Sequence, residues 1–161
     1  MILIKPEKSR IIHTGKIPER ALYILRNGFF AYVGTSEPGC LPHLTAMFYM
    51  WDQATNTIFL ITTKRSQKIS NIRRNTKVCV TVDMRSALSP AYNQGVMIRG
   101  RAMLVEMELV DEKVSLDYLS KYARFLGTGY PIGNRIGIKV IPKTLSYWKG
   151  PEFYKWTNPE I

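Results

Sequence analysis

Metal ligands, disulfide partners and long apolar segments are scarce in this sequence of 161 residues. Its two cysteines, Cys40 and Cys79, form no CxxC pair, and its two histidines, His13 and His43, lie far apart without a cluster of other ligands nearby. No run of about 18 apolar residues is present that could span a bilayer. These absences argue against a disulfide framework, a metal site and a membrane span.

Several functional signatures are also missing. The N-terminus has no continuous apolar segment of the kind found in secretory signal peptides, because Lys5 and Pro6 interrupt it. Neither a GxSxG elbow nor a Cys/His nucleophile signature occurs, so hydrolase chemistry has no support. The segment GTGYPIG at residues 127–133 follows a predicted helix and departs from GxGxxG, so we interpret it as a turn. We expect a soluble, cytoplasmic protein.

Acidic residues are outnumbered: 23 Lys and Arg against 12 Asp and Glu give a net charge of +11 and a pI near 9.8. Between Asp52 and Asp83 there is no acidic residue at all. The same interval contains six basic residues, namely Lys64, Arg65, Lys68, Arg73, Arg74 and Lys77. Such a charge balance predicts an anionic partner, which could be nucleic acid, an anionic membrane surface or a phosphorylated small molecule.

The length suits one domain covering residues 1–161, and its apolar periodicity predicts mostly strands. We predict helices at 17–27, 66–75 and 111–126, and strands at 29–36, 43–51, 58–63, 77–83, 95–106 and 135–148. Gly100, inside the long fifth strand, suggests a bulge at a barrel corner. The predicted fold is therefore mainly β: a six- to seven-stranded antiparallel barrel with peripheral helices, since closure removes exposed sheet edges.

The most informative segment is ITTKRSQKISN, residues 61–71, in which a strand ends in hydroxyl residues just before a helix start. Free backbone N–H groups at that start, the Ser66 hydroxyl and the Lys68 ammonium could converge on one phosphate. The plainer alternative is that Ser66 only caps the helix and Lys68 is only a solvated residue. The residues alone leave both interpretations open.

This segment, with GCLPHLTAMFYMWD before it and GVMIRGRAMLVE after it, resembles the FMN-binding split barrel of pyridoxamine 5'-phosphate oxidase-like proteins, including their deazaflavin-dependent branch. The resemblance covers roughly residues 20–108. It implies a flavin whose phosphate lies against the helix start and whose ring packs on the strand near residue 45. The cofactor-binding residues that it implies are His43, Thr45, Ala46, Met47, Thr62, Thr63, Lys64, Arg65, Ser66, Lys68, Asn71 and Gln94.

The resemblance also implies a homodimer in which the second subunit completes each flavin site, commonly with residues late in the chain. Five aromatic residues crowd the C-terminal segment SYWKGPEFYKW, and Trp148 is our candidate for covering the flavin. These aromatics could equally close the end of the barrel. No arginine follows Arg135, which departs from the substrate-binding pattern of true pyridoxamine-phosphate oxidases and makes pyridoxal phosphate synthesis doubtful.

The sequence thus predicts an FMN-dependent oxidoreductase with an unknown small-molecule substrate and no catalytic side chain of its own, because the flavin carries the electrons. The deazaflavin coenzyme F-420 is the alternative cofactor, since its phosphate-linked polyglutamate tail would suit the +11 charge. A flavin-binding protein that stores or senses the cofactor is not separable from an enzyme at this level. The alternative from another class is a basic nucleic-acid-binding barrel.

Overall fold

The structure is a computed structural model that describes residues 10–126 and 134–161. The turn predicted at 127–133 lies outside the described residues. The elements are, in chain order, β1 (Arg10–Thr14), α1 (Glu19–Asn27), β2 (Phe30–Ser36), β3 (Pro42–Phe48), β4 (Met50–Asp52), β5 (Thr57–Thr63), α2 (Gln67–Arg74), β6 (Lys77–Met84), β7 (Gln94–Glu106), α3 (Glu112–Leu126), β8 (Arg135–Lys149) and β9 (Glu152–Thr157). The three helices lie within the predicted ranges, and the predicted mainly β class is confirmed.

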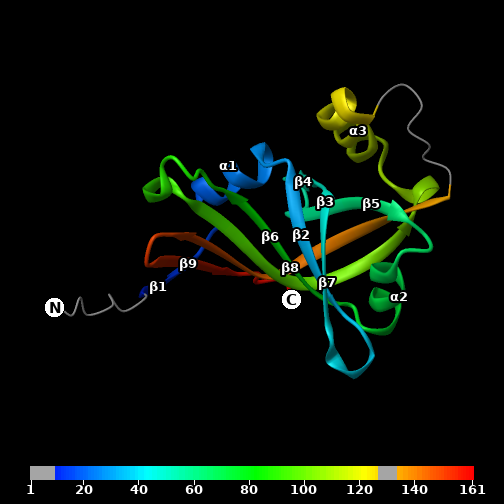
Figure 1. Cartoon of the computed structure of the whole chain (residues 1–161), viewed down its shortest axis with the longest axis horizontal. Coiled ribbons are helices and arrows are strands. Elements are labelled where there is room, and N and C mark those ends of the chain that lie inside the picture. Colours follow the sequence, from blue (N-terminus) through cyan, green and yellow to red (C-terminus); the bar gives the residue numbers. More distant parts are fainter. Residues whose placement is uncertain (1–9, 127–133) are drawn as a thin grey trace, which may run out of the picture.

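Among the described residues the strands form one sheet of nine, in the order β1-β9-β8-β7-β6-β2-β3, with β5 pairing both β8 and β4. Two strands at the chain ends raise the count above the predicted six or seven. The prediction of a purely antiparallel barrel is wrong at this edge, because β1 runs parallel to β9. Figure 1 shows β1 and β9 at one end of the molecule and α2 at the other.

The segment predicted as a single strand at 43–51 divides into β3 and β4 around Tyr49. The cause is the phenol of Tyr122 on α3: its oxygen accepts a hydrogen bond from the Tyr49 N–H at 2.9 Å, and its O–H lies 2.5 Å from the Tyr49 carbonyl. A side chain therefore takes the backbone bonds that a neighbouring strand would otherwise make.

The barrel interior is filled by alternate residues of the strands, as the 2.0 periodicity requires. On β6, Val78, Val80 and Val82 are buried as predicted. A register shift between Arg99 and Gly100 on β7 confirms the predicted bulge. A Cβ at Gly100 would overlap the Ile141 carbonyl, so only glycine permits this crossing of β7 and β8.

The two longer helices behave differently. α1 buries the apolar face that its sequence predicts, including Ile24 and Leu25. α3 does so only in part. The apolar set that its sequence predicts is Val114, Leu116, Leu119, Tyr122, Ala123 and Leu126. Tyr122 is buried as expected, but Leu116 is 56% exposed, and the buried Tyr118 was not expected. Those tyrosines pack with Met50, Phe59 and Ile61 in a second, smaller core over β4 and β5, which is the side of the sheet where Figure 1 places α3.

Candidate cofactor site at the start of α2

The chain turns from β5 into α2 at Ser66, which occupies the N-cap position. Its side chain nevertheless makes no capping hydrogen bond, and its Oγ is buried without a partner. The interpretation of Ser66 as a mere helix cap is therefore wrong in this structure. A buried hydroxyl without a partner is costly, which makes this Oγ available to a ligand group that can bond to it.

Lys68 follows two residues later and is also buried, at 9% exposure, so the alternative of a solvated lysine is wrong as well. Its Nζ donates a hydrogen bond to Thr62 Oγ1 at 3.3 Å. Burial lowers the pKa of the Lys68 ammonium below its ordinary value. Among the ion pairs of the described residues, none involves Lys68. An ammonium held among neutral groups is a suitable site for an anion.

Asn71 joins this helix start to the sheet. It is fully buried, and its Nδ2 donates to Thr35 Oγ1 on β2 at 2.9 Å. Its Oδ1 accepts hydrogen bonds from Gln67 at 2.9 Å and from Arg74 at 3.0 Å. Thr35 Oγ1 lies 3.4 Å from His43 Nδ1 on β3. Asn71 and His43 are both predicted contacts of the cofactor, although 28 positions separate them in the sequence. The structure links them through Thr35, which the sequence analysis missed.

The remaining residues of the β5–α2 turn are more open. Thr62 is buried and Thr63 is exposed, so they face opposite sides of the strand end. Lys64 forms an ion pair with Glu106 at 2.6 Å, which offsets part of its charge. Arg65 is exposed. The cationic character of the helix start therefore rests mainly on Lys68 and Arg65.

The ring-binding candidates on β3 alternate in orientation. Met47 is buried in the main core, Ala46 is exposed, and Thr45 is partly buried. Their backbone pairs with β2, where Ala46 lies opposite Tyr32 and Thr45 opposite Val33. Only the outward surface around Ala46 is open to a bound ring, because the Met47 side chain fills the core.

Gln94 and Trp148 lie elsewhere. Gln94 begins β7, whereas Glu106, the partner of Lys64, ends it; at about 3.3 Å per residue the two ends are roughly 40 Å apart along the strand. Gln94 Oε1 accepts a hydrogen bond from Tyr147 at 2.8 Å, and the Trp148 ring packs over Gly95. Within one chain, the structure does not bring these two residues to Ser66 and Lys68.

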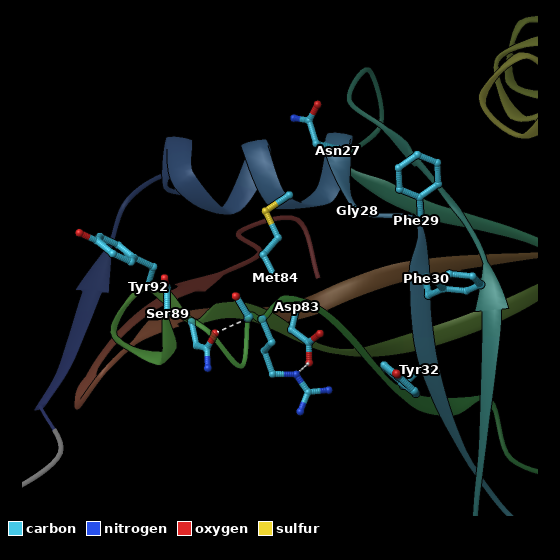
Figure 2. Close-up of a pocket in the computed structure, with 12 residues that line it drawn as sticks. Asn27, Gly28, Phe29, Phe30, Tyr32, Asp83, Met84, Ser89 and Tyr92 are labelled. Carbon is cyan, nitrogen blue, oxygen red and sulfur yellow. Dashed lines mark hydrogen bonds and ion pairs between the residues drawn. The ribbon is translucent and has the colours of Figure 1, made fainter.

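A pocket of about 770 Å³ near that far end was not predicted. Figure 2 shows Phe29, Phe30 and Tyr32 along one side of it and Tyr92 on the opposite side. Phe29, Phe30 and Tyr92 are 48%, 55% and 71% exposed, unusually open for aromatic side chains. We call this feature the aromatic pocket. The dense aromatic run at residues 29–32 was the signal that could have revealed it.

The C-terminal aromatics divide between the two roles considered for them. Tyr147 and Trp156 are buried in the main core, so they do help to close the barrel. Trp148, Phe153 and Tyr154 are only partly buried.

Across residues 10–126 and 134–161, no group of three His, Cys, Asp or Glu side chains is placed to hold a metal ion. No helix in the same ranges is long and apolar enough to cross a membrane.

Fold and site together define a split β-barrel with a buried, cationic helix start at one end. The family model of pyridoxamine 5'-phosphate oxidase matches residues 17–149, and the chain belongs to that family. No curated protein matches the sequence.

Solved structures share this fold at low identity. An F-420 reductase is 24% identical with a TM-score of 0.63, over 81% of this chain and 98% of that one. A conserved hypothetical protein, Rv2991 from Mycobacterium tuberculosis, is 21% identical with a TM-score of 0.65, over 83% and 86% of the two chains. An FAD-binding protein from Mesorhizobium loti is 16% identical with a TM-score of 0.64, over 82% and 94%.

Proposed function

We propose that the protein is a homodimeric oxidoreductase that binds a phosphorylated flavin, FMN in the first instance, with the phosphate at the start of α2. The observation that carries this proposal is the pairing of a buried, unpartnered Ser66 hydroxyl with a buried Lys68 ammonium. A phosphate would satisfy both, together with the first N–H groups of α2, which have no partner within the helix. Membership of a family named for an oxidase supports the redox chemistry.

The chain's own residues bind and orient the cofactor. Ser66, Lys68 and Thr62 hold the phosphate end, and Asn71 fixes the angle of α2 against β2 through Thr35. The ring would lie along the outward side of β3 near Ala46. When bound, the flavin supplies the electron and hydride chemistry, so no side chain need act as acid, base or nucleophile.

The separation of the candidate residues within one chain supports the homodimer in this proposal. Gln94, Trp148 and the aromatic pocket lie at the end of the sheet opposite Lys68, so one subunit's phosphate site and its partner's aromatic end would form each complete site. A two-fold axis produces two such sites at once. Exposed Leu44, at 69%, and Tyr32 on the outer sheet face provide apolar surface for the contact.

The deazaflavin coenzyme F-420 is the second candidate cofactor. The likeness to an F-420 reductase favours it, as does the net charge of +11. Synthesis of pyridoxal phosphate is not part of the proposal, because no arginine follows Arg135.

The test is an absorbance spectrum of the purified protein, followed by titration with FMN and with F-420. We expect saturable binding of one flavin per subunit. The variant Ser66→Ala/Lys68→Ala should weaken it by about 1.5 to 3 kcal/mol, roughly ten- to a hundredfold, because charge-assisted hydrogen bonds to the phosphate are lost. Ser70→Ala/Arg73→Ala, exposed on the same helix, is the matched control.

An equal loss of flavin affinity in the two double variants would contradict a phosphate site at Ser66 and Lys68. Binding of neither flavin, with tight binding of single-stranded nucleic acid, would favour the alternative class instead.

A further inference from the structure

A second groove, of about 1090 Å³, lies on the outer face of the sheet where β2, β6, β7 and β8 meet. It shares none of the residues that we assign to the flavin phosphate. Its lining includes Lys77 on β6 and Arg99 and Arg101 on β7, and Met103 takes the next outward position of β7. We call it the basic groove.

The charged side chains that line the basic groove are all basic, although Ile161, which carries the chain's terminal carboxylate, also lines it. Lys77, Arg99, Arg101 and Lys143 line it, and no Asp or Glu side chain does. Lys77 lies directly opposite Arg101 in the β6–β7 register. Like charges placed opposite each other on neighbouring strands destabilise a sheet. Among the described residues, no ion pair offsets these four cations, so the folded chain bears a cost that a bound anion would relieve.

The floor of the basic groove is apolar. Cys79 lies opposite Arg99 and Ile141 opposite Arg101, and Met103, which is 51% exposed, adds apolar surface further along β7. Gly34 faces Cys79 across the β2–β6 pair, and its missing side chain leaves the floor hollow. Burial raises the pKa of the Cys79 thiol, more than the neighbouring Arg99 lowers it, so this side chain stays neutral.

A cationic rim over an apolar floor is complementary to a particular ligand chemistry. A purely polyanionic chain would leave Met103 and Ile141 in contact with charged groups, and an uncharged lipid would leave the cations unpaired. A molecule that joins an apolar body to a carboxylate or phosphate satisfies both parts.

We propose that the basic groove binds an amphipathic organic anion, with its apolar body on Met103, Ile141 and Cys79 and its acidic group between Arg99, Arg101 and Lys77. This site is additional to the flavin site, since it uses none of the residues that we assign to the flavin phosphate. It lies on the outer sheet face beside Leu44 of the proposed dimer contact, which pairs with Gly34. It also gives a role to part of the positive charge that the phosphate site leaves unused.

The probe is dodecanoate, titrated by calorimetry into the full chain below the concentration at which it forms micelles, with dodecanol as the uncharged comparison. We expect saturable dodecanoate binding and much weaker dodecanol binding. The variant Arg99→Gln/Arg101→Gln should lower dodecanoate affinity about tenfold or more, because two charge-assisted contacts are lost. Both residues are exposed, so folding should be retained, as a melting curve would verify.

The matched control is Arg20→Gln/Arg124→Gln, which removes the same charge from exposed positions on α1 and α3. A similar loss of dodecanoate affinity in this control would show that the effect comes from net charge alone and would overturn the proposed site. Equal binding of dodecanol would overturn the role of the arginines. Tighter binding of a single-stranded oligonucleotide, abolished by Arg99→Gln/Arg101→Gln, would replace the proposal with a nucleic-acid surface. Flavin titration of the same variants gives a separate readout, which should not change.

Discussion

At the α2 end of the sheet, polar side chains are buried and bonded to one another, whereas at the opposite end aromatic side chains stand open to solvent. Asn71 and Lys68 are almost fully buried, while Phe30 and Tyr92 are more than half exposed. Each arrangement is unfavourable in isolation, since buried polar groups need partners and apolar surface favours cover. Under the proposed function the two ends would complement each other, through a ligand and a second copy of the chain.

The largest expected effect is on flavin binding, when the α2 end is mutated in one subunit and the far end in the other. Ser66→Ala/Lys68→Ala damages only the α2 end, and Gln94→Ala/Trp148→Ala damages only the far end. Each variant alone should bind flavin at least about tenfold more weakly, because every site of its homodimer has one damaged half. Co-expression with two different tags should restore one complete site in each mixed dimer.

Flavin absorbance of the purified mixed dimer measures this. Melting curves of each parent verify that Trp148→Ala still folds. Mixed dimers that bind no more flavin than their parents would show that each site lies within one subunit, and the comparison between the ends would lose its functional meaning.

An intermediate effect is expected on stability. Asn71→Leu removes the partner of Thr35 on β2 and the acceptor of Gln67 and Arg74. We expect the free energy of unfolding to fall by about 2 kcal/mol, because buried polar groups are left unpaired. Tyr92→Ser at the open end should change it by less than about 0.5 kcal/mol. Urea unfolding compares the two, and similar losses would contradict the contrast in burial.

The smallest effect concerns Lys121, which lies between the ends on α3. Its Nζ donates to the Tyr49 carbonyl at 3.2 Å and sits 4.1 Å from the Tyr49 ring centre. Burial lowers its pKa from 10.5 to about 8. Below pH 8 the lysine is charged in both states, and the folded chain bears the cost of desolvating it.

Between about pH 8 and 10.0 the unfolded chain holds more protons on this lysine, so stability rises with pH. Above 10.0 the raised pKa values of Tyr49 and of Tyr122, about 12, act in the opposite direction, because the unfolded chain loses those protons first. Between about pH 8 and 10.0 melting temperatures should rise less steeply in Lys121→Met than in the native chain, and the rise that remains is expected from Lys68, whose pKa burial also lowers. The change is small, since solvent screens a partly exposed group. A rise in Lys121→Met as steep as that of the native chain would assign the effect to another residue.

Local periodicity was enough for most elements. The alternation of Val78, Val80 and Val82 predicted both β6 and its buried face, and the apolar spacing of α1 predicted its contact with the barrel. On α3 the same reasoning was right only in part: Tyr122 is buried as expected, but the buried Tyr118 was missed and Leu116 is exposed. The face of α3 that meets β4 and β5 is packed around the two tyrosines. β1 was missed because a short parallel strand is stabilised only by β9, which lies far away in sequence.

For the candidate site, the sequence placed Ser66, Lys68 and Asn71 together, since a strand end followed by a helix start fixes their separation within a turn or two. The charge excess and the bulge at Gly100 were equally visible in the chain. Tertiary structure alone decided that Lys68 is buried, that Ser66 has no partner, and that Gln94 and Trp148 lie at the opposite end of the sheet. The physical reason is that burial and long-range pairing depend on which distant segments meet, and a linear pattern of residue types does not contain that information.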